Sequence, residues 1–252
     1  DDAASLLRFL PPDMVEQFRL LSDPMTVARL TEVVLDERRR PFAVVGGQRL
    51  FLWPDEPSKV VMAAQLAALA AALEADGTLG PDRWCGFDGH LGRVSVLRNG
   101  KGAVSGLSFR VGRYVRGVAD HLADLFLGSP PPPVTAQQTL HPPRSILVLG
   151  ARGAGKTTVL RDVCRRLSEV WGVMVVDTAG QICGDGDVPH EASVGLSRRM
   201  VVAEREAQHK VMLKTLQNHT PDVIVVDEIA GADEAAACAK IRSRGVCLIA
   251  GA

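Results

Sequence analysis

Residues 145–167 read SILVLGARGAGKTTVLRDVCRRL, an apolar run followed by a glycine-rich loop and then a helical pattern. The loop GARGAGKTT, residues 150–158, fits the spacing G-x-x-x-x-G-K-[ST]. Glycines let successive backbone N–H groups point inward around a phosphate without Cβ clashes. The helix that begins at Lys156 adds its positive N-terminal end. The stretch therefore predicts a phosphate-binding loop between a strand and a helix.

A second motif, which is acidic, supplies the carboxylate that a phosphate-binding loop needs to hold Mg²⁺. The run VIVVDE places Asp227 directly after four apolar residues and Glu228 next, and we expect the end of a strand neighbouring the loop. The spacing predicts metal binding by Thr157 and Asp227 and catalysis by Lys156 and Glu228, with Glu228 deprotonating the attacking water. The residues expected to bind a nucleoside triphosphate are Gly150, Arg152, Gly153, Ala154, Gly155, Lys156, Thr157 and Thr158.

The rest of the C-terminal half repeats this strand and helix rhythm. The apolar runs VMVVD, VIVVDE and VCLIAG alternate with helical patterns over residues 156–167, 204–219 and 233–242. Short apolar runs that alternate with helices are typical of a parallel sheet that is buried on both faces. The pattern predicts an α/β fold for residues 144–252, with a nucleotide-binding core built on a mainly parallel sheet.

The N-terminal half has a different texture. Residues 1–127 carry short strand-like runs, LTEVVLD, PFAVV and QRLFLW among them, together with an alanine-rich helical pattern over residues 58–73 that Ser58 could cap. We expect a smaller α+β domain there. Residues 128–143, GSPPPPVTAQQTLHPP, hold six prolines in sixteen residues, which favours an extended linker between the two domains.

Composition, charge and cysteine content narrow the range of protein classes to consider. The 252 residues carry 29 basic and 29 acidic side chains, so the bulk charge gives no reason to expect a nucleic acid partner. Five cysteines without a C-x-x-C pair favour free thiols in a reducing compartment. The sequence contains no apolar run long enough for a transmembrane segment.

Several segments together resemble the stage III sporulation protein AA-like P-loop ATPases, and most of all their cyanobacterial and plastid branch. The resemblance rests on GARGAGKTTVLRDVCRRLSE, VVDTAGQICGDGDVPH, RRMVV, QHKVMLKTLQNHTPDVIVVDEI and RGVCLIA, and it covers nearly all of residues 144–252. That family is similar to the motor ATPases of type II and type IV secretion. The resemblance implies a RecA-like core, ATP hydrolysis, a ring-shaped homo-oligomer such as a hexamer, and a place in the chloroplast stroma or otherwise the cytoplasm. It also implies nucleic acid binding by a region beyond Ala252, and a core that is incomplete at its C-terminal end.

The chain departs from the family in two places. The family typically shows D-T-S-N-E-I where this chain has DTAGQI, so Gln181 replaces a glutamate that could accept a proton. The family also continues RGVQLIAT with AHG, whereas this chain ends at Gly251 and Ala252. Two interpretations therefore stay open, an ATPase motor that works as a ring and a nucleotide-binding scaffold that hydrolyses ATP weakly.

A basic stretch carries a further hypothesis. No acidic residue occurs between Asp88 and Asp120, while the segment contains several arginines, Arg110 and Arg113 among them. The stretch is interpreted as a solvated strand face, as arginines supplied in trans to a neighbour's nucleotide, or as a path for nucleic acid phosphates.

Overall fold

A computed structural model describes residues 9–21, 28–75, 84–86, 89–127, 143–151 and 153–252. The chain divides into two compact units, Asp1–Arg113 with Gly184–Asp187, and Tyr114–Cys183 with Val188–Ala252. The expected proline-rich linker lies outside the described residues apart from its last position. The segment 114–127, expected at the end of the N-terminal domain, groups with the second unit. The domain limits drawn from the sequence stay a prediction.

The second unit is built on a five-stranded sheet in the order β7-β11-β10-β8-β9, in which every neighbouring pair is parallel. Every residue of β8, β10 and β11 is buried, as the short apolar runs indicated. This sheet confirms the predicted α/β fold class. The strands are β7 (Ile146–Val148), β8 (Val173–Thr178), β9 (Arg198–Val202), β10 (Val223–Val226) and β11 (Cys247–Gly251).

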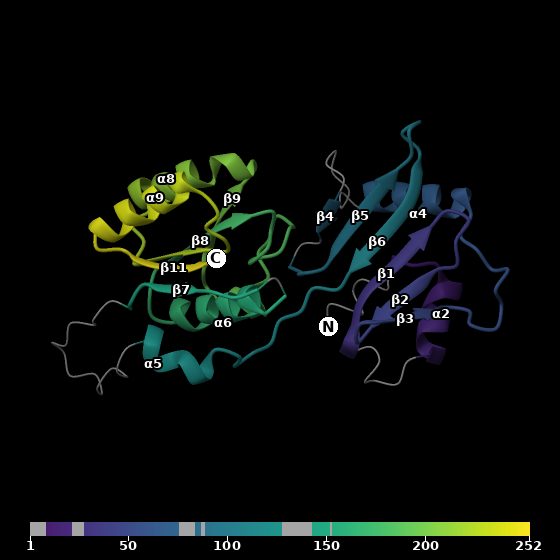
Figure 1. Cartoon of the computed structure of the whole chain (residues 1–252), viewed down its shortest axis with the longest axis horizontal. Coiled ribbons are helices and arrows are strands. Elements are labelled where there is room, and N and C mark those ends of the chain that lie inside the picture. Colours follow the sequence, from purple (N-terminus) through teal and green to yellow (C-terminus); the bar gives the residue numbers. More distant parts are fainter. Residues whose placement is uncertain (1–8, 22–27, 76–83, 87–88, 128–142, 152) are drawn as a thin grey trace. The chain divides into compact units, whose positions relative to one another are not determined.

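Helices cover both faces of this sheet (Figure 1). On one face α6 (Lys156–Ser168) packs with Leu160, Val163 and Leu167 into a core that also holds Phe126 of the short helix α5 (Ala123–Phe126). On the other face α8 (Gln208–Asn218) and α9 (Ala232–Ser243) bury Met212, Ala237 and Ile241. Short helical turns complete the unit at η1 (Asp120–Leu122), α7 (Glu191–Val194) and η2 (Arg205–Ala207).

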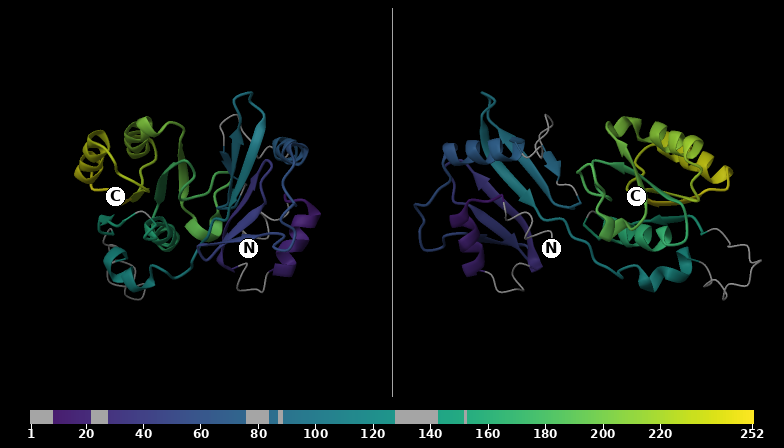
Figure 2. Two further views of the ribbon diagram at one scale, coloured as in Figure 1. Left: turned by 45° about the vertical axis from the view of Figure 1, so that its right-hand side comes forward. Right: turned by 180° about the vertical axis from the view of Figure 1, so that it is seen from behind.

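The first unit is built on an antiparallel sheet in the order β3-β2-β1-β6-β5-β4. Helices α2 (Pro12–Leu21) and α4 (Ala63–Ala75) lie on the same face of it (Figure 2). Their buried side chains share one core with β1 and β6. The strands are β1 (Leu30–Asp36), β2 (Phe42–Val45), β3 (Gln48–Phe51), β4 (Trp84–Gly86), β5 (Arg93–Arg98) and β6 (Val104–Arg110).

The predicted start of the alanine-rich helix is wrong. The helix α4 begins at Ala63 and not after Ser58. The reason is that Val61 forms a parallel bridge with Glu37 and donates its N–H to the Arg39 carbonyl, 3.0 Å away, which keeps the chain extended before the helix. The first turn is capped instead by the Gln65 side chain, whose Oε1 accepts the Met62 N–H at 2.9 Å.

Candidate nucleotide-binding site

The phosphate loop connects β7 to α6. Gly153 and Gly155 adopt φ angles of 80° and 91°, in the left-handed region that glycine enters without a Cβ clash. Gly155 occupies the N-cap position of α6, so the first helical N–H groups face the loop. The Lys156 ammonium donates to the carbonyl oxygens of Gly150 and Ala151, and it would exchange these two acceptors for phosphate oxygens. Arg152 lies outside the described residues.

The two predicted metal ligands meet across the sheet. The Thr157 hydroxyl of α6 donates to Asp227 Oδ1 at 2.8 Å, and Asp227 directly follows β10. The expectation that Asp227 ends a strand neighbouring the loop strand is corrected, because β11 lies between β7 and β10. The contact forms although β11 intervenes, because α6 packs against β11 and β8 on one face of the sheet and its first turn reaches Asp227.

Asp227 is buried, with 8% of its surface exposed, and among the described residues the Thr157 hydroxyl is the donor that reaches its carboxylate. Burial raises the pKa of Asp227, and the hydrogen bond from Thr157 and the charges of Arg161 and Lys156 oppose that rise. A hydroxyl and a carboxylate at a helix N-terminus are hard oxygen ligands of the kind that Mg²⁺ prefers. The residue pair therefore fits the ion that the sequence predicted.

Glu228 is held at both ends by one short segment. Its carboxylate pairs with Arg205, with 2.9 Å between Glu228 Oε2 and Arg205 Nη2, and its backbone carbonyl accepts the Gln208 side-chain amide at 2.8 Å. The Glu228 side chain is about half exposed, at 51%. A carboxylate with one oxygen on an arginine keeps acceptor positions for a water molecule. The geometry is therefore compatible with Glu228 as a general base whose orientation Arg205 and Gln208 fix.

Gln208 forms hydrogen bonds to the end of β8, to the residue pair after β10 and to the first turn of α9. The sequence did not identify it as a site residue. Gln208 is 1% exposed and accepts the hydroxyl of Thr178, the last residue of β8. Its amide also donates to Glu234 Oε1 at 2.9 Å, while Glu234 Oε2 caps α9 by accepting the Ala230 and Gly231 N–H groups. A buried polar network with its groups satisfied gives a single, rigid arrangement. The only sequence signal was a polar residue on the buried side of an amphipathic helix.

The loop after β8 is held in place by the penultimate residue of that strand. Asp177 is 1% exposed, and its two carboxylate oxygens accept the Ile182 N–H at 3.0 Å and the Cys183 N–H at 2.9 Å. Between them Ala179 and Gly180 turn the chain at φ angles of 57° and 58°. From α6, Arg161 donates to the Gln181 carbonyl at 2.6 Å and to the Ile182 carbonyl at 3.0 Å. These hydrogen bonds from two elements fix the loop.

The basic stretch is less isolated than the sequence suggested. In the first unit Arg93 Nε lies 2.9 Å from Asp185 Oδ2, and β1 places Glu32 opposite Arg110, with 3.7 Å between Glu32 Oε1 and Arg110 Nε. Arg113 donates to the Leu30 carbonyl. These acids come from distant parts of the chain and could not be seen in the local sequence. A role in trans for Arg110 and Arg113 stays a prediction.

Taken together, the sheet order, the glycine loop and the Thr157–Asp227 pair define a P-loop ATPase fold. The description "ATPase family associated with various cellular activities (AAA)" matches residues 146–241. Solved structures show the same fold at low identity. The pilus retraction motor PilT with bound ADP has a TM-score of 0.59 at 16% identity, and the match covers 94% of this chain and 66% of the PilT chain. The ATPase DotB of Yersinia pseudotuberculosis has a TM-score of 0.62 at 10% identity, and the match covers 96% of this chain and 65% of the DotB chain.

Within that class the chain is similar to proteins of plastid-bearing organisms. It is 37% identical to the uncharacterized protein ycf45 of Porphyra purpurea, over 99% of this chain and 40% of that protein. It is 36% identical to the protein SEEDLING PLASTID DEVELOPMENT 1 of Arabidopsis thaliana, over 98% of this chain and 33% of that protein. The protein ycf45 of Cyanidium caldarium is 32% identical over 88% and 61%. The chain thus spans less than two thirds of each relative. Across the part of the chain that the structure describes, no helix combines the length and apolarity that a membrane span requires.

Proposed function

We propose that this chain is the ATP-binding and ATP-hydrolysing core of a motor ATPase of the secretion-motor-like class. The observation that carries the proposal is the 2.8 Å hydrogen bond between Thr157 and Asp227. It joins the helix of the phosphate loop to the end of β10, next to Glu228. Loop, metal ligands and base therefore lie along one edge of one sheet, where nucleotides bind in open α/β folds.

Each residue has a separate task in the proposed reaction. The loop N–H groups and Lys156 bind the β- and γ-phosphates, and Thr157 and Asp227 hold Mg²⁺, which neutralises charge on the phosphate oxygens when it is bound. Glu228 accepts a proton from the attacking water. Arg205 and Gln208 keep Glu228 in position through the contacts described above, so they act through Glu228 and not on the substrate.

The second candidate is a scaffold subunit that binds ATP and hydrolyses it weakly. Two observations favour it, namely Gln181 where the similar family carries a glutamate, and the Glu228 carboxylate that already pairs with Arg205. Both weaken proton acceptance and leave the phosphate loop intact. The two candidates therefore differ in turnover and agree on binding.

The test is to measure ATP affinity and steady-state turnover of the same preparations. We expect Lys156→Ala to weaken ATP binding by about tenfold or more, since hydrogen bonds to charged groups contribute roughly 1.5–3 kcal/mol. We expect Glu228→Gln to bind ATP normally and to lose turnover by about 10²–10⁴-fold. The matched control is Glu206→Gln, which removes the same charge from an exposed neighbour of Arg205. Tight binding with no turnover in the unmodified chain would favour the scaffold.

The assembly and its location belong to the same proposal. The family resemblance supports a ring-shaped homo-oligomer, and the name of the Arabidopsis relative supports a role in plastids. Nucleic acid binding would fall to a region beyond Ala252. Size measurement of the chain with and without MgATP tests the ring, because a ring that forms on the nucleotide increases in mass when MgATP is added.

A further inference from the structure

A pocket in the same unit is lined by residues of α8 and α9 and by residues that precede β10 and β11. It has a volume of about 490 Å³, within the range of small-molecule sites. Thr220 and Pro221 of its wall precede β10, and Val246 precedes β11, whereas Asp227 follows β10. Because these strands are parallel, the pocket and the candidate nucleotide site lie at opposite edges of the sheet. The lining residues are Leu213, Leu216, Gln217, Thr220, Pro221, Lys240, Arg244 and Val246.

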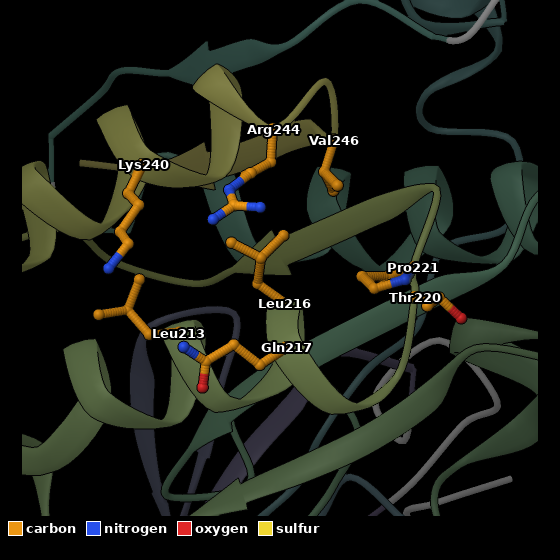
Figure 3. A pocket seen from close by; sticks show the side chains of 8 residues that line it. All are labelled: Leu213, Leu216, Gln217, Thr220, Pro221, Lys240, Arg244 and Val246. Atoms are coloured by element: carbon orange, nitrogen blue, oxygen red, sulfur yellow. The ribbon is translucent and has the colours of Figure 1, made fainter.

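The wall of the pocket combines an apolar floor with two cations. Leu213, Leu216 and Val246 are half-buried parts of the core between α8, α9 and the sheet. Lys240 and Arg244 stand one helical turn apart, and both charged heads point toward the side of the two leucines (Figure 3). None of the described lining residues is acidic. Within the described parts of the chain, no ion pair engages Lys240 or Arg244.

Helix polarity alone explains part of this charge. Cations near the C-terminal end of a helix such as α9 are stabilised by its macrodipole. That effect accounts for charge at the helix end, and it does not account for an apolar cavity beneath the charges. Arg242 lies in the same last turn, is exposed and does not line the pocket, so it serves as the example of a cation that only complements the helix.

The backbone at the rim is strained. Thr220 has a φ angle of 42°, in a region that a β-branched residue rarely enters. It also precedes Pro221, whose ring favours an extended conformation for the residue before it. Strained residues of this kind gather at ligand sites more often than elsewhere. The strain is a second observation, independent of charge, that distinguishes this corner of the fold.

We propose that this pocket binds a small organic anion with an apolar body, which is a carboxylate, sulfonate or phosphate monoester attached to an aliphatic or aromatic group. The anionic head lies between Lys240 and Arg244, and the apolar body lies on Leu213, Leu216 and Val246. Charge-assisted hydrogen bonds to two cations give the orientation, and burial of the apolar body gives most of the affinity. The inference does not rest on ATP hydrolysis.

The experiment uses the whole chain and the fluorescent probe anilinonaphthalene sulfonate, which is itself an anion with an apolar body. We expect saturable binding that octanoate displaces, while octanol and inorganic sulfate at equal concentration do not. Saturating MgADP should leave the probe bound, because the two sites lie at opposite edges of the sheet. Displacement of the probe by MgADP would place it in the phosphate loop and would overturn the proposal.

The variants identify the site. The double variant Lys240→Gln and Arg244→Gln should weaken probe binding by about tenfold or more, since two charge-assisted hydrogen bonds are lost. The control Arg242→Gln removes one charge from the same helical turn and should leave the affinity unchanged. All three side chains are exposed, so the melting temperature should not change. An unchanged affinity of the double variant would overturn the proposal.

A second measurement does not depend on variants. Addition of octanoate should shift backbone amide resonances of residues 213–221 and 240–246 and leave those of the phosphate loop in place. Shifts spread over the exposed surface, with none concentrated in these two segments, would show general detergent-like binding and would overturn the proposal.

Discussion

Two aspartates end adjacent strands of the parallel sheet, and the chain uses them for different purposes. Asp177 is the penultimate residue of β8, and Asp227 directly follows β10; the residues before them, Val176 and Val226, are paired. Both are buried, and burial raises the pKa of each carboxyl; the charge of Asp227 adds a smaller rise for Asp177, and that of Glu228 adds one for Asp227. Asp177 accepts two backbone N–H groups of its own loop. Asp227 accepts one hydroxyl, from the phosphate-loop helix.

The difference teaches how a buried carboxylate can be recognised as structural or as ligand-binding. A structural carboxylate has its donors supplied by backbone that it holds in place. A ligand-binding carboxylate remains short of donors and close to a cationic side chain, here Lys156. Burial and pKa do not separate the two aspartates, and the origin of the hydrogen-bond donors does.

The largest expected effect comes from exchanging each aspartate for alanine. Asp177→Ala leaves two buried N–H groups without an acceptor, at about 1–3 kcal/mol each, so we expect about 3 kcal/mol less stability. Asp227→Ala removes a poorly solvated charge and one hydroxyl contact, and we expect a change of about 1 kcal/mol or less. Urea unfolding measures both. Equal losses for the two variants would mean that the comparison is wrong.

Arg161 allows a finer test of how the β8 loop is held. Arg161→Ala removes the hydrogen bonds to the Gln181 and Ile182 carbonyls, and we expect a loss of about 2 kcal/mol. The control on the same helix is Arg166→Ala, which breaks a partly exposed ion pair with Asp120 that contributes about 0–1 kcal/mol. If the two variants unfold at the same urea concentration, the carbonyl contacts do not hold the loop.

Some of this arrangement could be predicted from sequence because it is local. The phosphate loop, the strand LTEVVLD and the start of the helix at Lys156 depend on neighbouring residues, and they occur at the predicted positions. The fully buried strands followed from uninterrupted apolar runs, and these runs also gave the fold class.

The remainder depends on contacts between distant residues. Gln208 and Arg205 gain their roles only when α8 is placed against the end of β10, and Arg110 meets Glu32 only after β1 pairs with β6. The insertion of β11 between β7 and β10 also leaves no local signal. Asp177 and Asp227 look alike in sequence, since both follow apolar runs, and only the donors around them differ.

A smaller effect should appear in the pH dependence of stability. Because burial raises the pKa of Asp227, the folded chain retains this proton to higher pH than the unfolded chain does. Stability is therefore lost as the pH rises through the folded pKa. Asp227→Asn removes that loss, while the rise in the Asp177 pKa that comes from burial remains in both proteins. We expect the variant to gain stability relative to the unmodified chain as the pH rises above about 4, the usual pKa of an unfolded aspartate.

The measurement is urea unfolding across that pH range with a chelator present, so that no divalent cation binds Asp227. The asparagine side chain of the variant keeps an oxygen for the Thr157 hydroxyl, so the variant tests the charge and not the hydrogen bond. Parallel stability curves for the two proteins would show that Asp227 has no raised pKa, and the contrast with Asp177 would then rest on hydrogen bonds alone.

The smallest expected effect concerns Gln181, which combines a structural contact with a possible role in the reaction. Its carbonyl belongs to the structural loop through Arg161, while its half-buried side chain occupies the position where the similar family carries a glutamate. A glutamine can orient water but cannot accept a proton from it. We expect Gln181→Glu to raise ATP turnover by about two- to fivefold with unchanged ATP affinity, because Glu228 already supplies most of the base catalysis.

Turnover of Gln181→Glu, alone and combined with Glu228→Gln, decides what the β8 loop does. If the loop takes part in the chemistry, the new carboxylate raises the rate of the single variant and restores some of the rate that the Glu228 variant loses. If the rate is flat in both backgrounds while the melting temperature is unchanged, position 181 is not part of the reaction. The end of β8 would then be structural throughout, from Asp177 to Cys183, and the chemistry would lie wholly at the end of β10 and the phosphate loop.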